Sequence, residues 1–179
     1  MEGRQLILVF WLIFIAYWVL STRESNANLF ELNYVWWRWL AVIVALVLVR
    51  RVPFLQVRLA SQTAVDAGIV MCAAGIGFAI WARRYLGINW SIRPAVRKGH
   101  ELITSGPYAI TRHPIYSGLL LAMLGSAMAD GVLWAIIFLV VGVGFIHRAK
   151  LEEALMTQQF PDQYPAYKRR TRAFIPFVV

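Results

Sequence analysis

The sequence predicts an all-α integral membrane protein with about five transmembrane helices, an ordered loop before the fourth helix and a helical C-terminal tail. Of its 179 residues, 60% are hydrophobic and 15% are charged, whereas charged residues make up roughly a quarter of a soluble domain. Several apolar runs approach the roughly 20 residues that cross a bilayer. The single cysteine excludes an intramolecular disulfide framework.

The first three apolar runs are each expected to form one helix. They extend from Gln5 to Ser21, from Tyr34 to Val49 and from Ala64 to Ala82. The first run could also be a signal peptide. Its apolar stretch is short enough, and the small residues Ser25-Asn26-Ala27 after it resemble a cleavage site. The start "MEGR" has no net charge, and Arg23 and Glu24 separate the run from that cleavage site. These features favour an uncleaved membrane helix.

Two shorter runs, Ile115 to Ala129 and Val132 to His147, are separated only by Asp130-Gly131. This dipeptide is a turn signal, so we expect a tight helical hairpin. At fifteen and sixteen residues, the two runs are marginal for a full span. We divide the chain into N-terminal helices, residues 1–63, and a core of residues 64–179.

Basic residues predict which side of the membrane each loop occupies. Because the hairpin returns the chain, the loop before it and the tail after it lie on the same side. Twelve of the 18 Lys and Arg residues fall there: Arg83, Arg84, Arg93, Arg97, Lys98, Arg112, Arg148, Lys150, Lys168, Arg169, Arg170 and Arg172. The positive-inside rule makes this side cytoplasmic and places the N-terminus outside. Arg50, Arg51 and Arg58 conflict with this topology, since they would then lie in an outer loop.

The polar residues therefore indicate a site at the membrane boundary. Mid-membrane polar residues, which a carrier would need, are scarce, and no internal repeat favours a transporter. Nothing in the chain provides elements that read nucleic acid. Leu86 to Tyr108 has no helical period but contains several glycines and prolines, so it reads as an ordered loop. This loop is either a plain connector or a functional segment, and long loops in compact domains are usually functional.

The stretch "TRHPIY" marks the start of the fourth helix, because Pro114 suits the first helical turn. An anionic group would be favoured at this terminus. Alternatively, Arg112 extends to lipid headgroups and Tyr116 is an interfacial aromatic residue. The acidic pair Glu152-Glu153 follows the fifth run, and either pairs with helix neighbours such as Arg148 or binds a cationic ligand group.

Three stretches, taken together and in order, resemble the isoprenylcysteine carboxyl methyltransferase family and its wider superfamily of membrane methyltransferases. They are "HELITSGPYAITRHPIYSG", the "EE" after the hairpin, and "FPDQYPAYKRRTRAFIPF". The family pattern is G-x-Y…R-H-P-x-Y-x-G, a hairpin, paired glutamates and a Y-x-x-Y-basic tail. The matching residues are Gly106, Tyr108, Arg112, His113, Pro114, Tyr116, Gly118, Glu152, Glu153, Tyr164 and Tyr167. The match extends over Leu86 to Phe177, and the first two helices carry no motif.

This resemblance implies an S-adenosylmethionine-dependent enzyme of the endoplasmic reticulum or of a bacterial or archaeal inner membrane, with its site facing the cytoplasm. The loop, the start of the fourth helix and the tail would form the cofactor pocket. The cofactor-binding residues would be His100, Leu102, Gly106, Tyr108, His113, Pro114, Tyr116 and Glu152. The catalytic residues would be Arg112 with Glu152, Glu153 or both. A lipophilic or prenylated substrate would reach the site from the bilayer.

The chemistry of these residue types agrees with methyl transfer. Aromatic rings suit a sulfonium cation, and a glutamate can pair with an ammonium group. A carboxylate acceptor is already ionised at pH 7, and Arg112 could bind it through two parallel hydrogen bonds. A phospholipid amine would instead need a base, which a glutamate could provide; a thiol is a further alternative. An alternative of another class is a non-enzymatic membrane subunit or carrier.

Metal and dinucleotide sites are not predicted. His100, His113, His147 and Cys72 lack the spacing of zinc ligands. The pairs Gly75-x-Gly77 and Gly142-x-Gly144 lie inside membrane helices and not after strands. We expect small residues to allow helices to approach closely: Gly68, Cys72, Gly75, Gly77, Gly118, Ala122, Ser126, Gly142 and Gly144.

Overall fold

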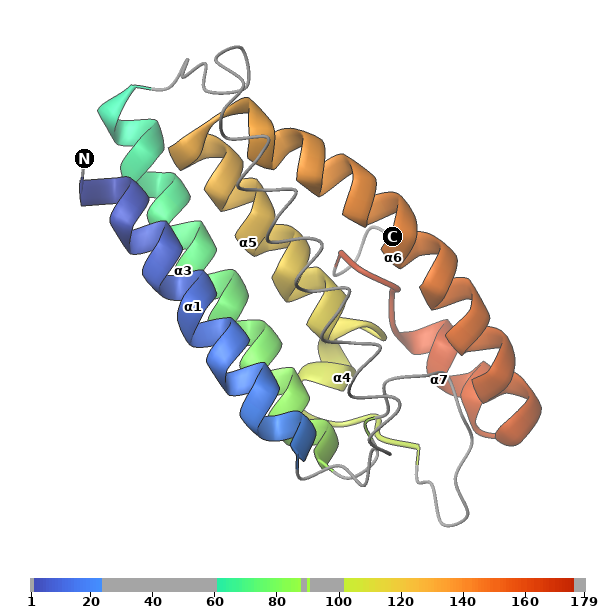
Figure 1. Cartoon of the computed structure of the whole chain (residues 1–179). Helices are drawn as coiled ribbons and strands as arrows, with labels where there is room; N and C mark the ends of the chain where they lie inside the picture. Colours follow the sequence, from blue (N-terminus) through green and yellow to red (C-terminus); the bar gives the residue numbers. More distant parts are fainter. Residues whose placement is uncertain (1, 24–60, 88–89, 91–101, 176–179) are drawn as a thin grey trace.

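The structure is a computed structural model that describes residues 2–23, 61–87, 90 and 102–175. Its long helices are α1 (Glu2–Arg23), α3 (Gln62–Leu86), α5 (Pro114–Asp130) and α6 (Val132–Gln159), and its short helices are α4 (Pro107–Ile110) and α7 (Tyr164–Arg170). Figure 1 shows the long helices side by side, with α4 and α7 together at one end. The described residues form no strand beyond one isolated bridge. The predicted all-helical class is therefore confirmed.

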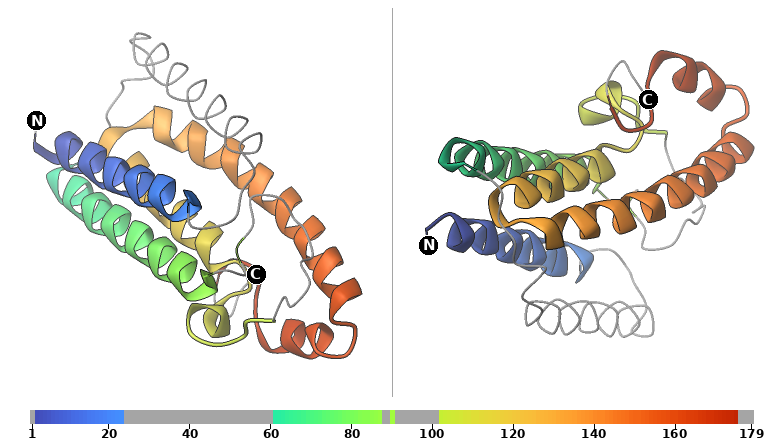
Figure 2. Two further views of the ribbon diagram at one scale, coloured as in Figure 1. Left: turned by 60° about the horizontal axis from the view of Figure 1, so that its bottom comes forward. Right: turned by 90° about the horizontal axis from the view of Figure 1, so that it is seen from above.

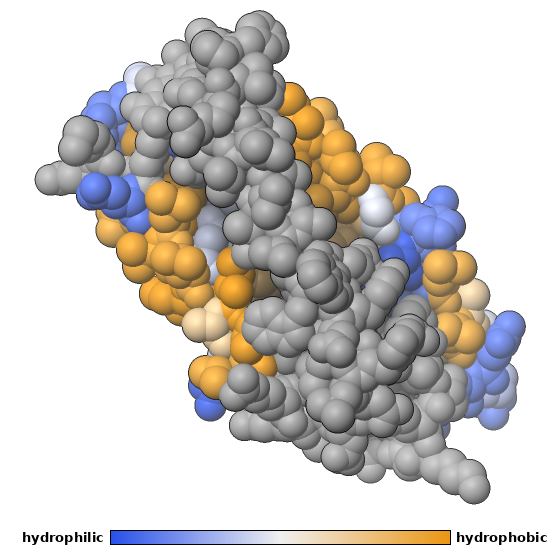
Figure 3. Space-filling view, viewed as in Figure 1, coloured by the Kyte–Doolittle hydropathy of each residue, from blue (hydrophilic) through white to orange (hydrophobic). Residues whose placement is uncertain are grey.

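Among the described residues, two helices, α3 with 25 residues and α6 with 28 residues, are long and apolar enough to cross a bilayer. Helix α1 contains the shorter apolar stretch Gln5–Ser21, and α5 has 17 residues. The second predicted helix, Tyr34 to Val49, lies outside the described residues, so the count of five crossings stays a prediction. Figure 3 shows hydrophobic surface over α1 and over α6, and on α6 the side chains of Leu139, Val140 and Val143 are exposed. Such side chains suit contact with lipid.

Among the described helices, α3 and α5 are in the closest contact, through facing glycines. We call this contact the α3–α5 seam. A Cβ atom at Gly75 would lie 2.5 Å from the backbone oxygen of Gly118 and 2.5 Å from the backbone nitrogen of Ala122. A Cβ atom at Gly68 would lie 2.5 Å from the backbone oxygen of Gly125. The two backbones therefore touch, as small residues allow in membrane helices. Cys72 and Ser126 are fully buried in the same interface, which confirms the predicted close approach.

Three other glycines do not take part in this contact. Within the described part of the chain, no heavy atom lies within 4 Å of a Cβ placed at Gly77 or Gly144. The nearest atom to a Cβ at Gly142 is a side-chain carbon of Leu120, at 3.5 Å. At these three positions the described residues form no close backbone contact of the kind seen at Gly68 and Gly75.

Aromatic residues join α1 and the hairpin to this seam. The Trp11 indole donates to the Ser126 hydroxyl at 3.0 Å and stacks on Trp134 with ring centroids 5.1 Å apart. The Trp134 indole donates in turn to the Asp130 carboxylate at 3.1 Å. These bonds satisfy buried polar groups that would otherwise be costly in an apolar interior.

The helical hairpin forms as predicted and turns at Gly131, whose φ is +104°. Helix α6 continues to Gln159, past the end of the apolar run at His147. The apolar run ends at His147, but the residues after it are mainly good helix formers such as Ala, Leu, Glu, Lys and Met. The pairing of Arg148 with Glu152, considered from the sequence, already requires helix at these positions.

This extension brings the acidic pair beside the chain that leads into α5. Pro114, the first residue of α5, lies 17 residues before Gly131, whereas Glu152 lies 21 residues after it. With a rise of about 1.5 Å per residue, Glu152 therefore lies about one turn beyond the start of α5. Figure 2 shows α6 diverging from α5 and continuing to α7.

Candidate functional site

The site is built around the extended segment 111–113, between α4 and α5. Gly106 precedes α4 with φ +58°, and the Tyr85 ring lies so close that a Cβ at Gly106 would come within 2.6 Å of it. A left-handed φ and this contact both require glycine. Pro114 begins α5 as predicted, since a proline is tolerated at the first helical position.

The C-terminal tail pairs with this segment. Thr111 and Arg172 form an isolated parallel bridge. The backbone N–H of Arg112 donates to the carbonyl of Arg172 at 2.8 Å, and that of His113 donates to the carbonyl of Ala173 at 3.0 Å. The backbone at two predicted site residues is therefore held by the tail.

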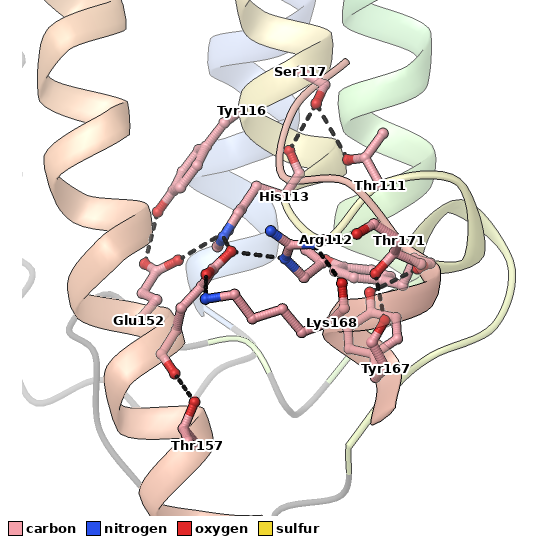
Figure 4. A network of polar contacts seen from close by, with 12 residues as sticks. Thr111, Arg112, His113, Tyr116, Ser117, Glu152, Thr157, Tyr167, Lys168 and Thr171 are labelled. Atoms are coloured by element: carbon pink, nitrogen blue, oxygen red, sulfur yellow. Dashed lines mark hydrogen bonds and ion pairs between the residues drawn. The ribbon is translucent and has the colours of Figure 1, made fainter. Parts of the chain in front are cut away.

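The Arg112 side chain connects three elements (Figure 4). Its Nε donates to Glu153 Oε1 on α6 at 2.7 Å. Its Nη1 donates to the carbonyl oxygens of Lys168 and Thr171 at the end of α7. Lys168 Nζ lies 2.6 Å from the other carboxylate oxygen of Glu153. The Arg112 and Glu153 side chains are only 10% and 12% exposed, so this ion pair is largely shielded from water.

Glu152 has a separate set of partners. Its Oε1 accepts from the Tyr116 hydroxyl at 2.7 Å and from Arg148 Nε at 2.9 Å. The Tyr116 ring stacks on Phe145 with centroids 4.5 Å apart. The pairing of Arg148 with Glu152, four residues apart, is the helix contact considered from the sequence. It coexists here with contacts from α5.

His113 lies between the two carboxylates. Its Nδ1 is 3.5 Å from Glu152 Oε2, and its Nε2 is 3.4 Å from Glu153 Oε1. Burial disfavours the charged imidazole, but the two glutamates outweigh burial and raise the pKa of His113 above its usual value. Nε2 is buried and forms no hydrogen bond with the described residues. One polar atom of the site therefore lacks a hydrogen-bond partner there.

The predicted site residues divide into two groups. Arg112, His113, Tyr116, Glu152 and Glu153 come together in one cluster of polar contacts (Figure 4).

Gly106 and Tyr108 lie beside the end of α3 instead, and Leu102 is half-buried. The hydroxyl of Tyr108 donates to the carbonyl of Ala82 at 3.5 Å, and its own carbonyl accepts from the Tyr167 hydroxyl at 2.6 Å. The hydroxyl of Tyr108 is thus engaged by α3, and its contact with a cofactor stays a prediction. His100 lies outside the described residues.

Sequence reasoning missed the parts of the site that the tail provides. Lys168 was assigned only to the basic face, and Ser117, Thr171 and Phe174 were not considered. The Y-x-x-Y-basic pattern could have singled out Lys168, since it follows Tyr167 directly. No local signal identifies Phe174, whose ring stacks on His113 with centroids 5.6 Å apart. Among the described residues, no group of three or more His, Cys, Asp or Glu side chains is placed to hold a metal ion.

Fold and site together define an all-helical membrane protein with a charged site at the ends of its helices. Residues 63–163, more than half of the chain, match the family described as phospholipid methyltransferase. The chain belongs to this family. The expected class, a membrane methyltransferase, is confirmed at the level of the family.

Curated relatives share parts of the sequence. The nickel-cobalt-cadmium resistance protein NccN of Alcaligenes xylosoxydans xylosoxydans is 32% identical over 111 residues, which cover 61% of this chain and 46% of that protein. Protein-S-isoprenylcysteine O-methyltransferase B of Arabidopsis thaliana is 41% identical over 81 residues, 44% of this chain and 41% of that protein. The protein-S-isoprenylcysteine O-methyltransferase of Schizosaccharomyces pombe is 36% identical over 83 residues, 45% of this chain and 35% of that protein. The chain thus spans less than half the length of these relatives.

Proposed function

We propose that this protein transfers a methyl group from S-adenosylmethionine to the carboxylate of a lipophilic acceptor, such as an isoprenylcysteine, at the cytoplasmic boundary of the membrane. The observation that carries the proposal is the cluster of Arg112, His113 and the two glutamates, in a chain of the phospholipid methyltransferase family. The likeness to two isoprenylcysteine methyltransferases supports the choice of acceptor.

The residues of the cluster fit S-adenosylmethionine, which supplies an electrophilic methyl group on a sulfonium when bound. The buried Nε2 of His113 has only the 3.4 Å contact with Glu153 and forms no hydrogen bond with the described residues, so it could donate to an acceptor atom of the ligand. The Tyr116 ring stacks on His113 and so lies beside it, and such rings attract cations. An ammonium group would find a carboxylate in the same place.

Of the two glutamates, Glu152 is the better candidate to hold that ammonium group. Both oxygens of Glu153 are occupied at short range, by Arg112 at 2.7 Å and Lys168 at 2.6 Å. Glu152 uses only Oε1 at short range, and its Oε2 has the longer 3.5 Å contact with His113. Its side chain is also 26% exposed, against 12% for Glu153. Glu153 would then anchor Arg112.

The contacts of Arg112 limit how it can bind an acceptor. Its Nε donates to Glu153, and its Nη1 donates to two carbonyls of the tail. Two parallel hydrogen bonds to a carboxylate would need neighbouring nitrogens of the guanidinium, and two of the three nitrogens are already engaged. We therefore revise the expected two-point contact: Nη2 would donate to one acceptor oxygen, while the other contacts hold the guanidinium in place.

The charge of the cluster favours an anionic acceptor over an amine. Arg112, Arg148 and Lys168 surround two carboxylates, and protonated His113 would add a further positive charge. A carboxylate acceptor is ionised at pH 7 and needs no base. An amine would have to lose a proton to a base, and both glutamates already sit in ion pairs.

Alignment of donor and acceptor in the site can lower the barrier to methyl transfer by several kcal/mol.

The test begins with calorimetric titration of the detergent-purified protein with S-adenosylmethionine. We expect binding by the parent, weaker binding by Glu152→Gln, and lost turnover with a smaller change in donor affinity for Arg112→Ala. Methyl transfer from labelled donor to a prenylcysteine analogue is then compared with transfer to phosphatidylethanolamine. The absence of donor binding by the parent would refute methyl transfer, and preferential labelling of phosphatidylethanolamine would identify the amine acceptor instead.

A further inference from the structure

The C-terminal segment Thr171–Ile175 lies directly against the residues that build the site. It accepts backbone hydrogen bonds from Arg112 and His113 through Arg172 and Ala173. Because these two donors precede α5, they have no partner inside that helix. The tail therefore fixes the backbone from which both predicted site side chains extend.

Two side-chain contacts strengthen this arrangement. The Phe174 ring stacks on the His113 ring at an angle of 30°. The Ser117 hydroxyl, one turn into α5, donates to the Phe174 carbonyl at 2.6 Å and also lies 3.1 Å from the His113 carbonyl. Figure 4 shows Ser117 and Thr111 where the tail passes α5. Ser117 thus joins the tail to the residue on which Phe174 stacks.

The orientation of the His113 ring depends on contacts from three directions. Glu152 and Glu153 reach its nitrogens from α6, and Tyr116 stacks on it from α5 with centroids 5.5 Å apart. Phe174 is the contact from the tail. The carboxylate contacts are long, at 3.5 and 3.4 Å, so they hold the His113 ring only loosely. Stacking by Tyr116 and Phe174 restricts the rotation that remains.

We infer that Phe174 and Ser117 are positioning residues, which hold His113 and Arg112 in place for the reaction through the paired C-terminal tail. The inference rests on the proposed function for its effect on turnover, but the tail pairing itself can be measured separately. Neither residue belongs to the α3–α5 seam where the glycine backbones touch. Their loss should therefore disturb the site more than the helical core.

The kinetic experiment uses the full chain with Phe174→Ala, with Phe174→Tyr, which keeps the ring, and with Ile175→Ala. Ile175 is the adjacent, exposed residue and the matched control. We expect Phe174→Ala to lower kcat about tenfold or more while KM changes by less than about threefold, because small misplacements of reacting groups have large effects on rate. Phe174→Tyr and Ile175→Ala should keep the parental kcat. A parental kcat in Phe174→Ala would overturn the inference.

Hydrogen–deuterium exchange tests the same inference without turnover. The peptide that contains the amides of Arg112 and His113 should exchange slowly in the parent and in Ile175→Ala, and faster in Phe174→Ala and Ser117→Ala. Faster exchange confined to this peptide and to the tail would support positioning. Parental protection in both variants would refute it. If the parent fails to bind S-adenosylmethionine, the proposed function falls, and the exchange result still decides whether the tail holds the segment.

Discussion

Glu153 shows how one side chain holds the site together. Its carboxylate contacts Arg112, Lys168 and His113, which come from the segment before α5 and from α7. Arg112 in turn donates to the carbonyl of Lys168, so the three residues close a ring of contacts. Removing the negative charge would leave a nearly buried guanidinium without its counter-ion, and this is costlier than the ion pair is stabilising.

We expect Glu153→Gln to lower the free energy of unfolding by about 3 kcal/mol, the lower end of the range for breaking a buried ion pair. The measurement is thermal or denaturant unfolding of the detergent-purified protein. Asp162→Asn is the matched control, because it also removes one negative charge but at an exposed position. Equal stability of Glu153→Gln and the parent would show that the ion pair contributes little.

The pH dependence of stability should report on His113. Its pKa is raised in the folded protein, against burial, by the two glutamates. Its contribution to stability is therefore fully present below its unfolded pKa of about 6.5. It is lost as the pH rises through the higher folded pKa. We expect the parent to lose Tm over this interval relative to His113→Gln, measured from pH 6 to pH 9. Parallel curves for the two proteins would contradict this assignment.

At the scale of elements, local sequence patterns predicted the α3–α5 seam but not the pairing of residues 111–113 with the tail. Small residues at helical spacing indicated the seam, the Asp130-Gly131 turn indicated the hairpin, and Pro114 marked the start of α5. All three are local signals, and the structure has all three features. The pairing of residues 111–113 with the tail could not be predicted, since its partners are about 60 residues apart and depend on where α6 ends.

The α3–α5 seam predicts that two glycines on α3 differ in their tolerance of a side chain. Gly75→Ala would place a Cβ 2.5 Å from backbone atoms of α5, and helix backbones cannot move aside as a side chain can. We expect a loss of about 1–3 kcal/mol in unfolding free energy, as for other overpacked cores. Gly77→Ala is the control, because alanine has the higher helix propensity and a Cβ there meets no described atom within 4 Å. A Gly75→Ala variant as stable as Gly77→Ala would rule out backbone contact at the seam.

At the scale of the whole molecule, the predicted site residues that lie on described elements gather at one end of the helices, at the ends of α3 and α6 and the start of α5 (Figure 1). The opposite end carries the start of α3 and the hairpin turn. The sequence predicted that charges would gather on one face, from the hairpin and the distribution of Lys and Arg. The sequence left open which of the two glutamates contacts Arg112, because that depends on the register between α5, α6 and the tail.

The predicted topology can be tested with introduced cysteines. Cys72, the single native cysteine, is fully buried and should not react with a membrane-impermeant maleimide. Asp162→Cys, in the exposed turn between α6 and α7, should be labelled only from the cytoplasmic side. Gln62→Cys, exposed at the start of α3, should be labelled only from the outer side. The reverse labelling would overturn the cytoplasmic orientation that the positive-inside rule predicts.

The length of α6 past the hairpin turn has an evolutionary consequence. Each residue of a helix adds about 1.5 Å of rise and 100° of rotation. One codon inserted or deleted between Gly131 and Arg148 would therefore swing both glutamates away from Arg112 and His113, even if the altered stretch stayed apolar. Point substitutions on the lipid-facing side of α6 would leave that alignment intact. Selection on this stretch should thus tolerate drift in composition but not changes in length.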